Sequence, residues 1–136
     1  MTGVVDYMKN VSSSTAEELA MPGQEAYDYY GTGRNTGAHW VNRSATMFFE
    51  PFLQFNSIDS GARIQAATMV IHSDAALVPD GARRFHASLP GTKQLHWMKT
   101  AQHIDFYDVK PVVDEAAAMA VSWFDRTLRA GTSPAK

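Results

Sequence analysis

An alternation of apolar segments along the second part of the chain constrains its fold more than any other feature. Ala67 to His72 (ATMVIH) is a short run with β-branched residues, and Lys93 to Met98 places Leu95 and Trp97 on one face, as strands do. A set of apolar residues at helical spacing follows each run: Val78, Ala82, Phe85 and Leu89, then Val113, Ala116, Ala117, Ala120, Phe124 and Leu128. The order strand, helix, strand, helix predicts parallel strands joined by right-handed crossovers.

The predicted fold class is therefore α/β, a small parallel sheet with flanking helices. Pro90 and Gly91 end the first helix, and we expect the second to run from Asp108 to Gly131. An open parallel sheet normally has more strands than this and cover on both faces. We therefore expect the sheet to belong to a larger one, or to have its exposed edge covered by another chain.

Residues 1–56 differ in character from residues 57–136, and predict a helical region ahead of the strand–helix region within one domain. Thr15 is expected to cap a short helix with Glu17 and Glu18 in its first turn. Pro22 leads into a second helix over residues 24–30, and a glycine-containing loop follows.

A third helix is predicted from apolar residues at helical spacing near Pro51, which limits or kinks it. These residues are Val41, Ala45, Phe48, Phe49 and Phe52. We expect Phe48 and Phe49 to pack in the core. Three tyrosines of the preceding helix either pack likewise or line a substrate pocket: Tyr27, Tyr29 and Tyr30.

Composition and charge exclude several classes of protein. The 136 residues carry a formal net charge of -2, and their Lys and Arg are scattered, which argues against nucleic-acid binding. There is no cysteine, so disulfides, thiolate zinc sites and a cysteine nucleophile within this sequence are excluded. No apolar run approaches the roughly 20 residues that span a bilayer, and the N-terminus does not resemble a signal peptide. We expect a soluble cytoplasmic protein.

Two loops that follow the predicted strands carry the candidate catalytic residues. Asp74 lies in the loop after the first strand, and His103 in the loop after the second. Because the carboxyl ends of parallel strands meet at one edge of a sheet, a carboxylate here can orient an imidazole. We expect the side chains of Asp74 and His103 to approach hydrogen-bond distance, roughly 2.6–3.2 Å.

Other residues near these loops are given different roles. Asp80 is the alternative acid, although its position favours capping of the helix that begins there. His72, at the end of the first strand, is expected to support the site structurally. His72, Asp74 and His103 define no metal coordination set, so neither a metal nor a cofactor is predicted.

The segments VIHSDAALVPDGARRF and QHIDFYD resemble the acid loop and the histidine loop of α/β-hydrolases, in the dienelactone-hydrolase-like and peptidase-like branches of that family. The order of acid before histidine is also that of the family. The resemblance covers most of the chain and is strongest from Ile64 to Leu128. It implies the C-terminal half of the hydrolase fold, with residues 1–56 as cap-like helices. It also implies hydrolysis of an ester, amide or similar bond, with His103 as general base and then acid, and Asp74 holding its tautomer.

The chain departs from the family in lacking the nucleophile. No serine stands in a G-x-S-x-G motif, and the oxyanion-hole loop is absent. We therefore expect the chain to be nearly inactive alone, and to act on a small-molecule substrate only when completed by an N-terminal half. Two alternatives remain: a non-catalytic domain that binds a small molecule or a partner, and a self-associating interaction domain. Because this region supplies only a few strands and the half that would flank them is absent, we do not expect the chain to be a compact monomer.

Overall fold

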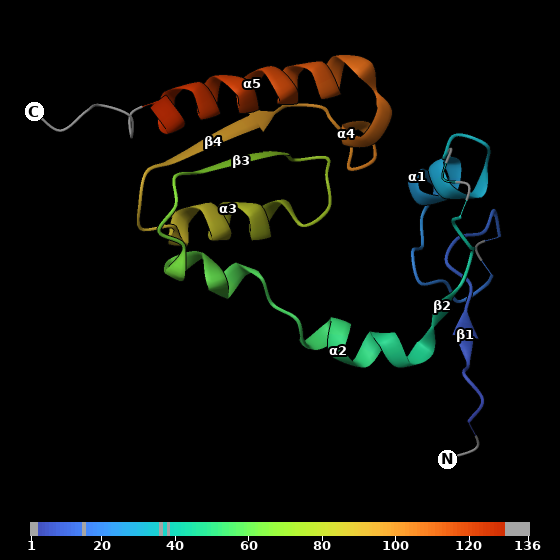
Figure 1. Ribbon diagram of the computed structural model, residues 1–136. Helices are drawn as coiled ribbons and strands as arrows, with labels where there is room; N and C mark the ends of the chain where they lie inside the picture. Colours follow the sequence, from blue (N-terminus) through green and yellow to red (C-terminus); the bar gives the residue numbers. More distant parts are fainter. Residues whose placement is uncertain (1–2, 15, 36, 38, 130–136) are drawn as a thin grey trace, which may run out of the picture. The chain divides into compact units, whose positions relative to one another are not determined.

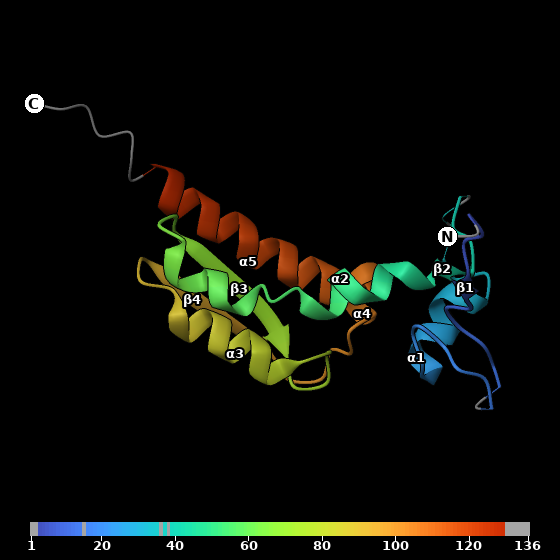
Figure 2. The same cartoon turned by 90° about the horizontal axis from the view of Figure 1, so that it is seen from below.

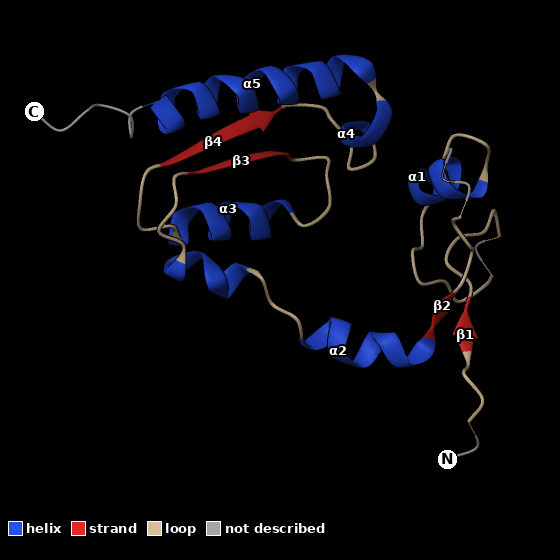
Figure 3. Cartoon of the chain, in the orientation of Figure 1, coloured by secondary structure: helices blue, strands red, loops and turns tan. Residues whose placement is uncertain are grey.

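The computed structural model describes residues 3–14, 16–35, 37 and 39–129. It divides into two compact units, Met1–Phe55 and Asn56–Lys136, which are described separately. Figure 1 follows the elements along the chain, and Figure 3 separates helices from strands. Within the described ranges, no helix combines the length and the apolar character that crossing a membrane requires.

The second unit is built on a two-stranded parallel sheet, as the sequence predicts. Strand β3 (Thr68–Ser73) pairs with β4 (Lys93–Met98) in a register that runs from Thr68 opposite Lys93 to Ser73 opposite Met98. Helix α3 (Pro79–Ser88) lies on one side of the strands and α5 (Lys110–Arg129) on the other (Figures 1 and 2). The 3-10 helix η3 (Ile58–Arg63) precedes β3, and the short helix α4 (Asp105–Asp108) precedes α5. This unit is a mixed α/β unit whose parallel strands pack against helices.

The alternation of side chains along β4 assigns one face of the sheet to each long helix. Gln94 and His96 face α5, where they bond Arg126 and Glu115 at 2.6 and 2.8 Å. Trp97 faces α3, because the guanidinium of Arg83 lies over its ring at 4.1 Å from the centroid. With a side-chain period of two, β3 presents alternate residues to the same two helices.

The core of this unit is concentrated beneath α5 and around the loops that leave the strands. Its buried apolar residues are Ala76, Leu89, Met98, Ala101, Ile104 and Trp123. Phe124 and Leu128 were expected in the buried stripe of α5, but both are more than half exposed. That part of the prediction is wrong because the sheet is only two strands wide, and Trp123 already covers it.

The ends of α3 and α5 differ from the expected ones. Val78 is the N-terminal cap residue of α3, and Asp80 lies inside the first turn, where it pairs with Arg83 instead of capping the helix. The Lys93 ammonium donates to three carbonyls at the other end of α3, those of His86, Ala87 and Leu89. Asp108 ends α4 and does not open α5, and Gly131 lies outside the described residues.

The first unit holds a minimal antiparallel pair, β1 (Tyr7–Met8) with β2 (Ser44–Ala45). Helix α1 (Gln24–Ala26) continues as a π-type turn over Tyr27–Gly31, so the helix expected at residues 24–30 is present. The 3-10 helix η2 (Thr46–Phe48) leads directly into α2 (Phe49–Gln54).

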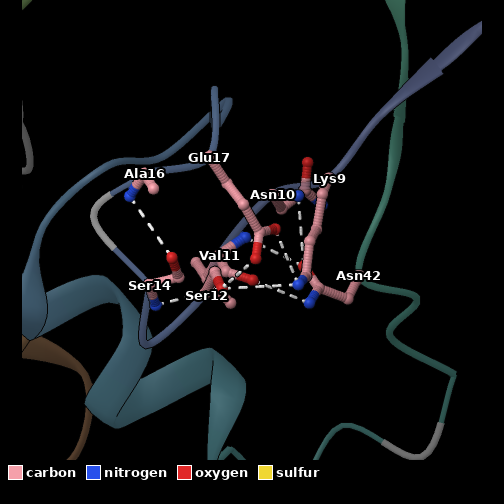
Figure 4. A network of polar contacts seen from close by, with 8 residues as sticks. All are labelled: Lys9, Asn10, Val11, Ser12, Ser14, Ala16, Glu17 and Asn42. Atoms are coloured by element: carbon pink, nitrogen blue, oxygen red, sulfur yellow. Dashed lines mark hydrogen bonds and ion pairs between the residues drawn. The ribbon is translucent and has the colours of Figure 1, made fainter.

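The Asn42 side chain links two distant segments of the first unit (Figure 4). Its carbonyl oxygen accepts from the backbone N–H groups of Asn10 and Val11 at 3.1 and 2.9 Å, and its amide donates to the Val11 carbonyl at 2.9 Å. The Ser44 hydroxyl donates to the Asn10 side chain at 2.7 Å. These bonds and the pairing of β2 hold residues 42–45 out of a helix, so the helix expected from Val41 begins later than predicted.

The helix expected after Thr15 is also absent from the described residues that follow it. Thr15 itself lies outside them, and residues 16–20 form turns and bends. Glu17, predicted to sit in a helical first turn, instead accepts hydrogen bonds from Lys9 at 2.9 Å and from Ser12 at 3.0 Å. The Lys9 hydrogen bond is the main cause that lowers the pKa of Glu17. A short helix is only marginally stable by itself, so the hydrogen bonds of the Glu17 side chain with Lys9 and Ser12 outweigh its formation here.

The aromatic residues of the first unit pack mainly on one another. Phe48 stacks on Phe52 with ring centroids 5.0 Å apart, and both rings are about half exposed. The prediction that Phe48 lies in a core is therefore wrong. Tyr30 stacks on Trp40 at 5.3 Å, so this tyrosine packs against a ring of its own unit.

The half-buried His86 of α3 should make the stability of the protein depend on pH. Its Nε2 is buried without a hydrogen-bond partner among the described residues, and burial lowers the pKa of His86 below its ordinary value of 6.5. The unfolded chain therefore binds a proton at higher pH than the folded one, and stability falls as pH drops below about 6.5. Urea unfolding of a His86→Leu variant should lose this dependence, whereas His39→Gln, at an exposed position, should keep it.

Candidate functional site

A buried serine joins the two loops that carry the candidate catalytic residues. The fully buried Ser73 ends β3, and its hydroxyl donates to the carbonyl of Ala101 in the loop after β4. The same oxygen accepts the N–H groups of Ala75 and Ala76, each at 3.2 Å. One hydroxyl therefore shapes the loop that contains Asp74 and attaches it to the loop that contains His103. The two loops lie at the same end of the parallel strands, as expected.

The Asp74 carboxylate is engaged on the face of the sheet that α3 covers. One oxygen forms an ion pair with Arg83, and the other accepts from the Trp97 indole N–H at 3.0 Å. The Arg83 hydrogen bond, followed by that of Trp97, lowers the pKa of Asp74 below its ordinary value. This carboxylate is therefore ionised at neutral pH and held in one orientation.

His103 lies in the turn that leads into α4. The residue is half-buried, and two buried apolar residues, Ala101 and Ile104, flank it in the sequence. The Nε2 atom is 3.0 Å from the Tyr107 hydroxyl, and the two rings meet edge to face at 5.5 Å. Asp105 stabilises the turn by accepting the N–H of Gln102 at 2.8 Å. Nδ1, the nitrogen that an orienting acid would hold, bonds no residue in the described ranges.

The hydrogen bond expected between Asp74 and His103 is not formed. Both oxygens of Asp74 are bonded to Arg83 and Trp97, and the ring of His103 is bonded to Tyr107. The backbone places the two loops at one end of the strands, but the side chains have separate partners. The preformed dyad is therefore a wrong prediction, because a guanidinium and an indole N–H offer the carboxylate two donors where the imidazole offers one.

His72 and Asp80 belong to the cluster around Asp74. The His72 ring stacks on Trp97 with centroids 5.3 Å apart, and its Nδ1 lies 2.9 Å from the Ser73 carbonyl oxygen. The Asp80 carboxylate lies 3.1 Å from the guanidinium of Arg83, which also pairs with Asp74. Asp80, the alternative acid, forms no hydrogen bond with His103. Across the described ranges, no three His, Asp or Glu residues gather as metal ligands would.

An apolar groove of about 710 Å³ opens beside the loop that contains Asp74. Its walls come from η3, β3 and α3, and His72 is one of its polar lining residues. The apolar lining residues include Ile58, Ile64, Val70, Leu77 and Phe85. Val78 also lines the groove, and its backbone is left-handed (φ 53°, ψ 51°) although its side chain is β-branched. Such a conformation is strained and recurs at functional loops.

The site also contains Ser73, Arg83 and Trp97, which the sequence alone does not assign to it. Ser73 immediately precedes the acid, but a serine at a strand end carries no pattern that assigns it a partner 28 residues away. The alternation of residues 93–98 places Trp97 on one face of a strand but gives it no hydrogen-bond partner. The spacing of Arg83 three residues after Asp80 was the one available signal, since such pairs meet on a helix surface.

No protein-family model matches the sequence, and no curated protein matches it.

Removal of the Ser73 hydroxyl should destabilise the second unit. Ser73→Ala leaves the Ala101 carbonyl and two N–H groups without their buried partner, which should lower the free energy of unfolding by about 2 kcal/mol. Chemical denaturation measures this. Ser60→Ala is the matched control, because that hydroxyl bonds only the Ser57 carbonyl of its own turn. Equal stability of the two variants would contradict the role given to Ser73.

Relief of the strain at Val78 should stabilise the protein. Asparagine tolerates the left-handed region better than valine, so Val78→Asn should raise the free energy of unfolding by about 1 kcal/mol. Leu77→Asn is the control, because Leu77 is similarly exposed and its φ is not positive. A Val78→Asn variant less stable than the parent would show that its side-chain contacts in the groove outweigh the strain.

Proposed function

We propose that the chain is the C-terminal part of an α/β-hydrolase-type domain and supplies the histidine of its catalytic site. The observation that supports this most is the buried hydrogen bond from Ser73 to Ala101. It links the loop that contains Asp74 to the loop that contains His103, at the carboxyl end of two parallel strands. The strand–helix–strand–helix order and the acid-before-histidine order agree with it. Residues 1–56 would then correspond to the cap-like region of such a domain.

In the proposed mechanism, His103 takes the proton of a nucleophile and later returns it to the leaving group. Nδ1 has no bond to a described residue, so it is the nitrogen available to an orienting carboxylate. Nε2 lies 3.0 Å from the Tyr107 hydroxyl, and a nucleophile would displace that contact. Asp74 would act as the acid once its hydrogen bond from the Trp97 indole is replaced by one from His103. The ion pair with Arg83 would keep the carboxylate ionised.

The nucleophile and the oxyanion-hole donors would come from another stretch of polypeptide, because no serine in this sequence lies in the required motif. The substrate class is an ester, amide or similar bond in a small molecule. The apolar groove beside His72 would bind the apolar portion of that substrate. A cytoplasmic location forms part of the proposal, and the absence of cysteine agrees with it.

The purified chain should therefore show almost no turnover of a small activated ester and no labelling by a fluorophosphonate probe, since triad members act as a unit. When the chain is expressed with the open reading frame immediately upstream, a serine outside these 136 residues should be labelled. Labelling should be lost in His103→Ala and kept in His96→Gln, because His96 faces α5 and bonds Glu115. Fluorophosphonate labelling of the chain alone would contradict the proposal.

A further inference from the structure

Strand β3 has an open edge. In a parallel pair, alternate backbone groups of each strand point away from the neighbour. Those of the middle of β3, Met69 to Ile71, form no hydrogen bond with any residue that the structure describes, apart from the pairing with β4. The side chains from Thr68 to His72 are only half-buried, although helices lie on both faces. Exposed strand edges of this kind pair readily with another strand.

The two strands differ in how their outer edges are protected. Strand β4 carries Lys93, Gln94 and His96, each bonded to a neighbouring helix, and polar or charged residues of this kind disfavour edge pairing. Strand β3 (TMVIHS) carries no Lys, Arg, Asp or Glu and is rich in β-branched and apolar residues. It has the composition of an inner strand of a sheet.

Apolar surface flanks the open edge on both faces. The groove of about 710 Å³ lies toward η3 and α3, and a second groove of about 240 Å³ lies between β3 and α5, lined by Met69, Ile71 and Phe124 among others. Helix α5 also carries an exposed stripe, defined as Ala117, Val121, Phe124 and Leu128. Val121, Phe124 and Leu128 are 61%, 55% and 68% exposed. The i, i+4, i+7, i+11 spacing is that of a helix–helix seam.

The stripe lies on the flank of α5 nearer to the open edge. At roughly 100° per residue, Phe124 lies about 100° around α5 from the buried Trp123, and Val121 lies about 160° around in the same sense. Glu115 and Arg126 fall on the other side of Trp123. Glu115 and Arg126 reach β4. Phe124 and Ala117 therefore point past β3, on the flank of α5 nearer to the open edge, and Leu128 and Val121 lie on the outer part of the same flank.

A second copy fits both features at once. Helix α5 lies over both strands, because Trp123 and Phe124 flank β3 while Arg126 bonds β4. A copy joined edge to edge at β3 would place its α5 two strand spacings away, about 9.6 Å. Packed helices lie about 8–10 Å apart. A two-fold axis that pairs β3 with its counterpart therefore also packs one α5 stripe against the other.

We propose that two copies of this chain associate through β3 and the α5 stripe into one four-stranded sheet covered by helices on both faces. Neither surface carries a charge, so the copies meet without like-charge repulsion, and a charged partner would find no complement. The inference goes beyond the proposed hydrolase function and does not rest on it. A nucleophile-bearing segment that needs the β3 edge would compete with this association.

Sedimentation equilibrium of the full chain over a wide concentration range tests the proposal. The parent should show a reversible monomer–dimer equilibrium. Val121→Glu should raise the dimer dissociation constant roughly tenfold or more, with an unchanged circular dichroism spectrum because Val121 is exposed in one copy. Ser122→Glu, one residue along and off the stripe, should leave the constant unchanged. A parent that is monomeric throughout, or a Val121→Glu variant that dimerises as the parent does, would overturn the proposal.

A cross-linking measurement tests the geometry separately. The chain has no cysteine, so Val121→Cys introduces one reactive site per copy. A short bis-maleimide should link two copies through this position, on the flank of α5 that faces the second copy, and should link Ser122→Cys, on the opposite flank, far less. Equal cross-linking of the two variants would show that the copies meet elsewhere. Neither measurement depends on hydrolysis, so its failure leaves the proposed enzymatic role untouched.

Discussion

The hydroxyl of Ser73 is the interaction on which the arrangement of the second unit depends. It is fully buried, donates to the loop after β4 and accepts from two N–H groups of the loop after β3. Without it, the buried Ala101 carbonyl and the N–H groups of Ala75 and Ala76 would each lose a hydrogen-bond partner, and the loop after β3 would lose its bond to the loop after β4. Asp74 follows it directly, and His103 lies two residues after Ala101. The positions of both candidate catalytic residues are therefore set by one side chain that takes no part in the proposed chemistry.

The donors around a carboxylate decide what that carboxylate can do. Asp74 satisfies both oxygens with Arg83 and Trp97, on the face of the sheet covered by α3. That arrangement ionises and orients the carboxylate, but directs it away from His103. In the proposed hydrolase, the addition of a nucleophile-bearing segment would have to change this balance of donors. Arg83 also lies over the Trp97 ring, so the indole, guanidinium and carboxylate form one cluster.

The asymmetry between the two strands connects the fold with the proposed association. Strand β4 ends the sheet on one side with polar residues that already have partners, and β3 leaves the other side uncharged and unpaired. Helix α5 repeats this asymmetry, since its polar flank reaches β4 and its apolar flank points past β3. Two strands leave the side chains from Thr68 to His72 only half-buried between the two helices, and a strand added at β3 would bury them further.

The sequence by itself determined the elements of the second unit, because hydrophobic periodicity and β-branched runs are local signals that survive without knowledge of the fold. It placed β3, α3 and β4 and predicted their parallel pairing, and it brought Asp74 and His103 to one end of the strands. Only the tertiary structure decided the partners of Asp74, the buried bonds of Ser73 and the loss of the helix at Val41. Each depends on donors or acceptors distant in sequence, such as Trp97, Ala101 and Asn10, whose proximity no local pattern records.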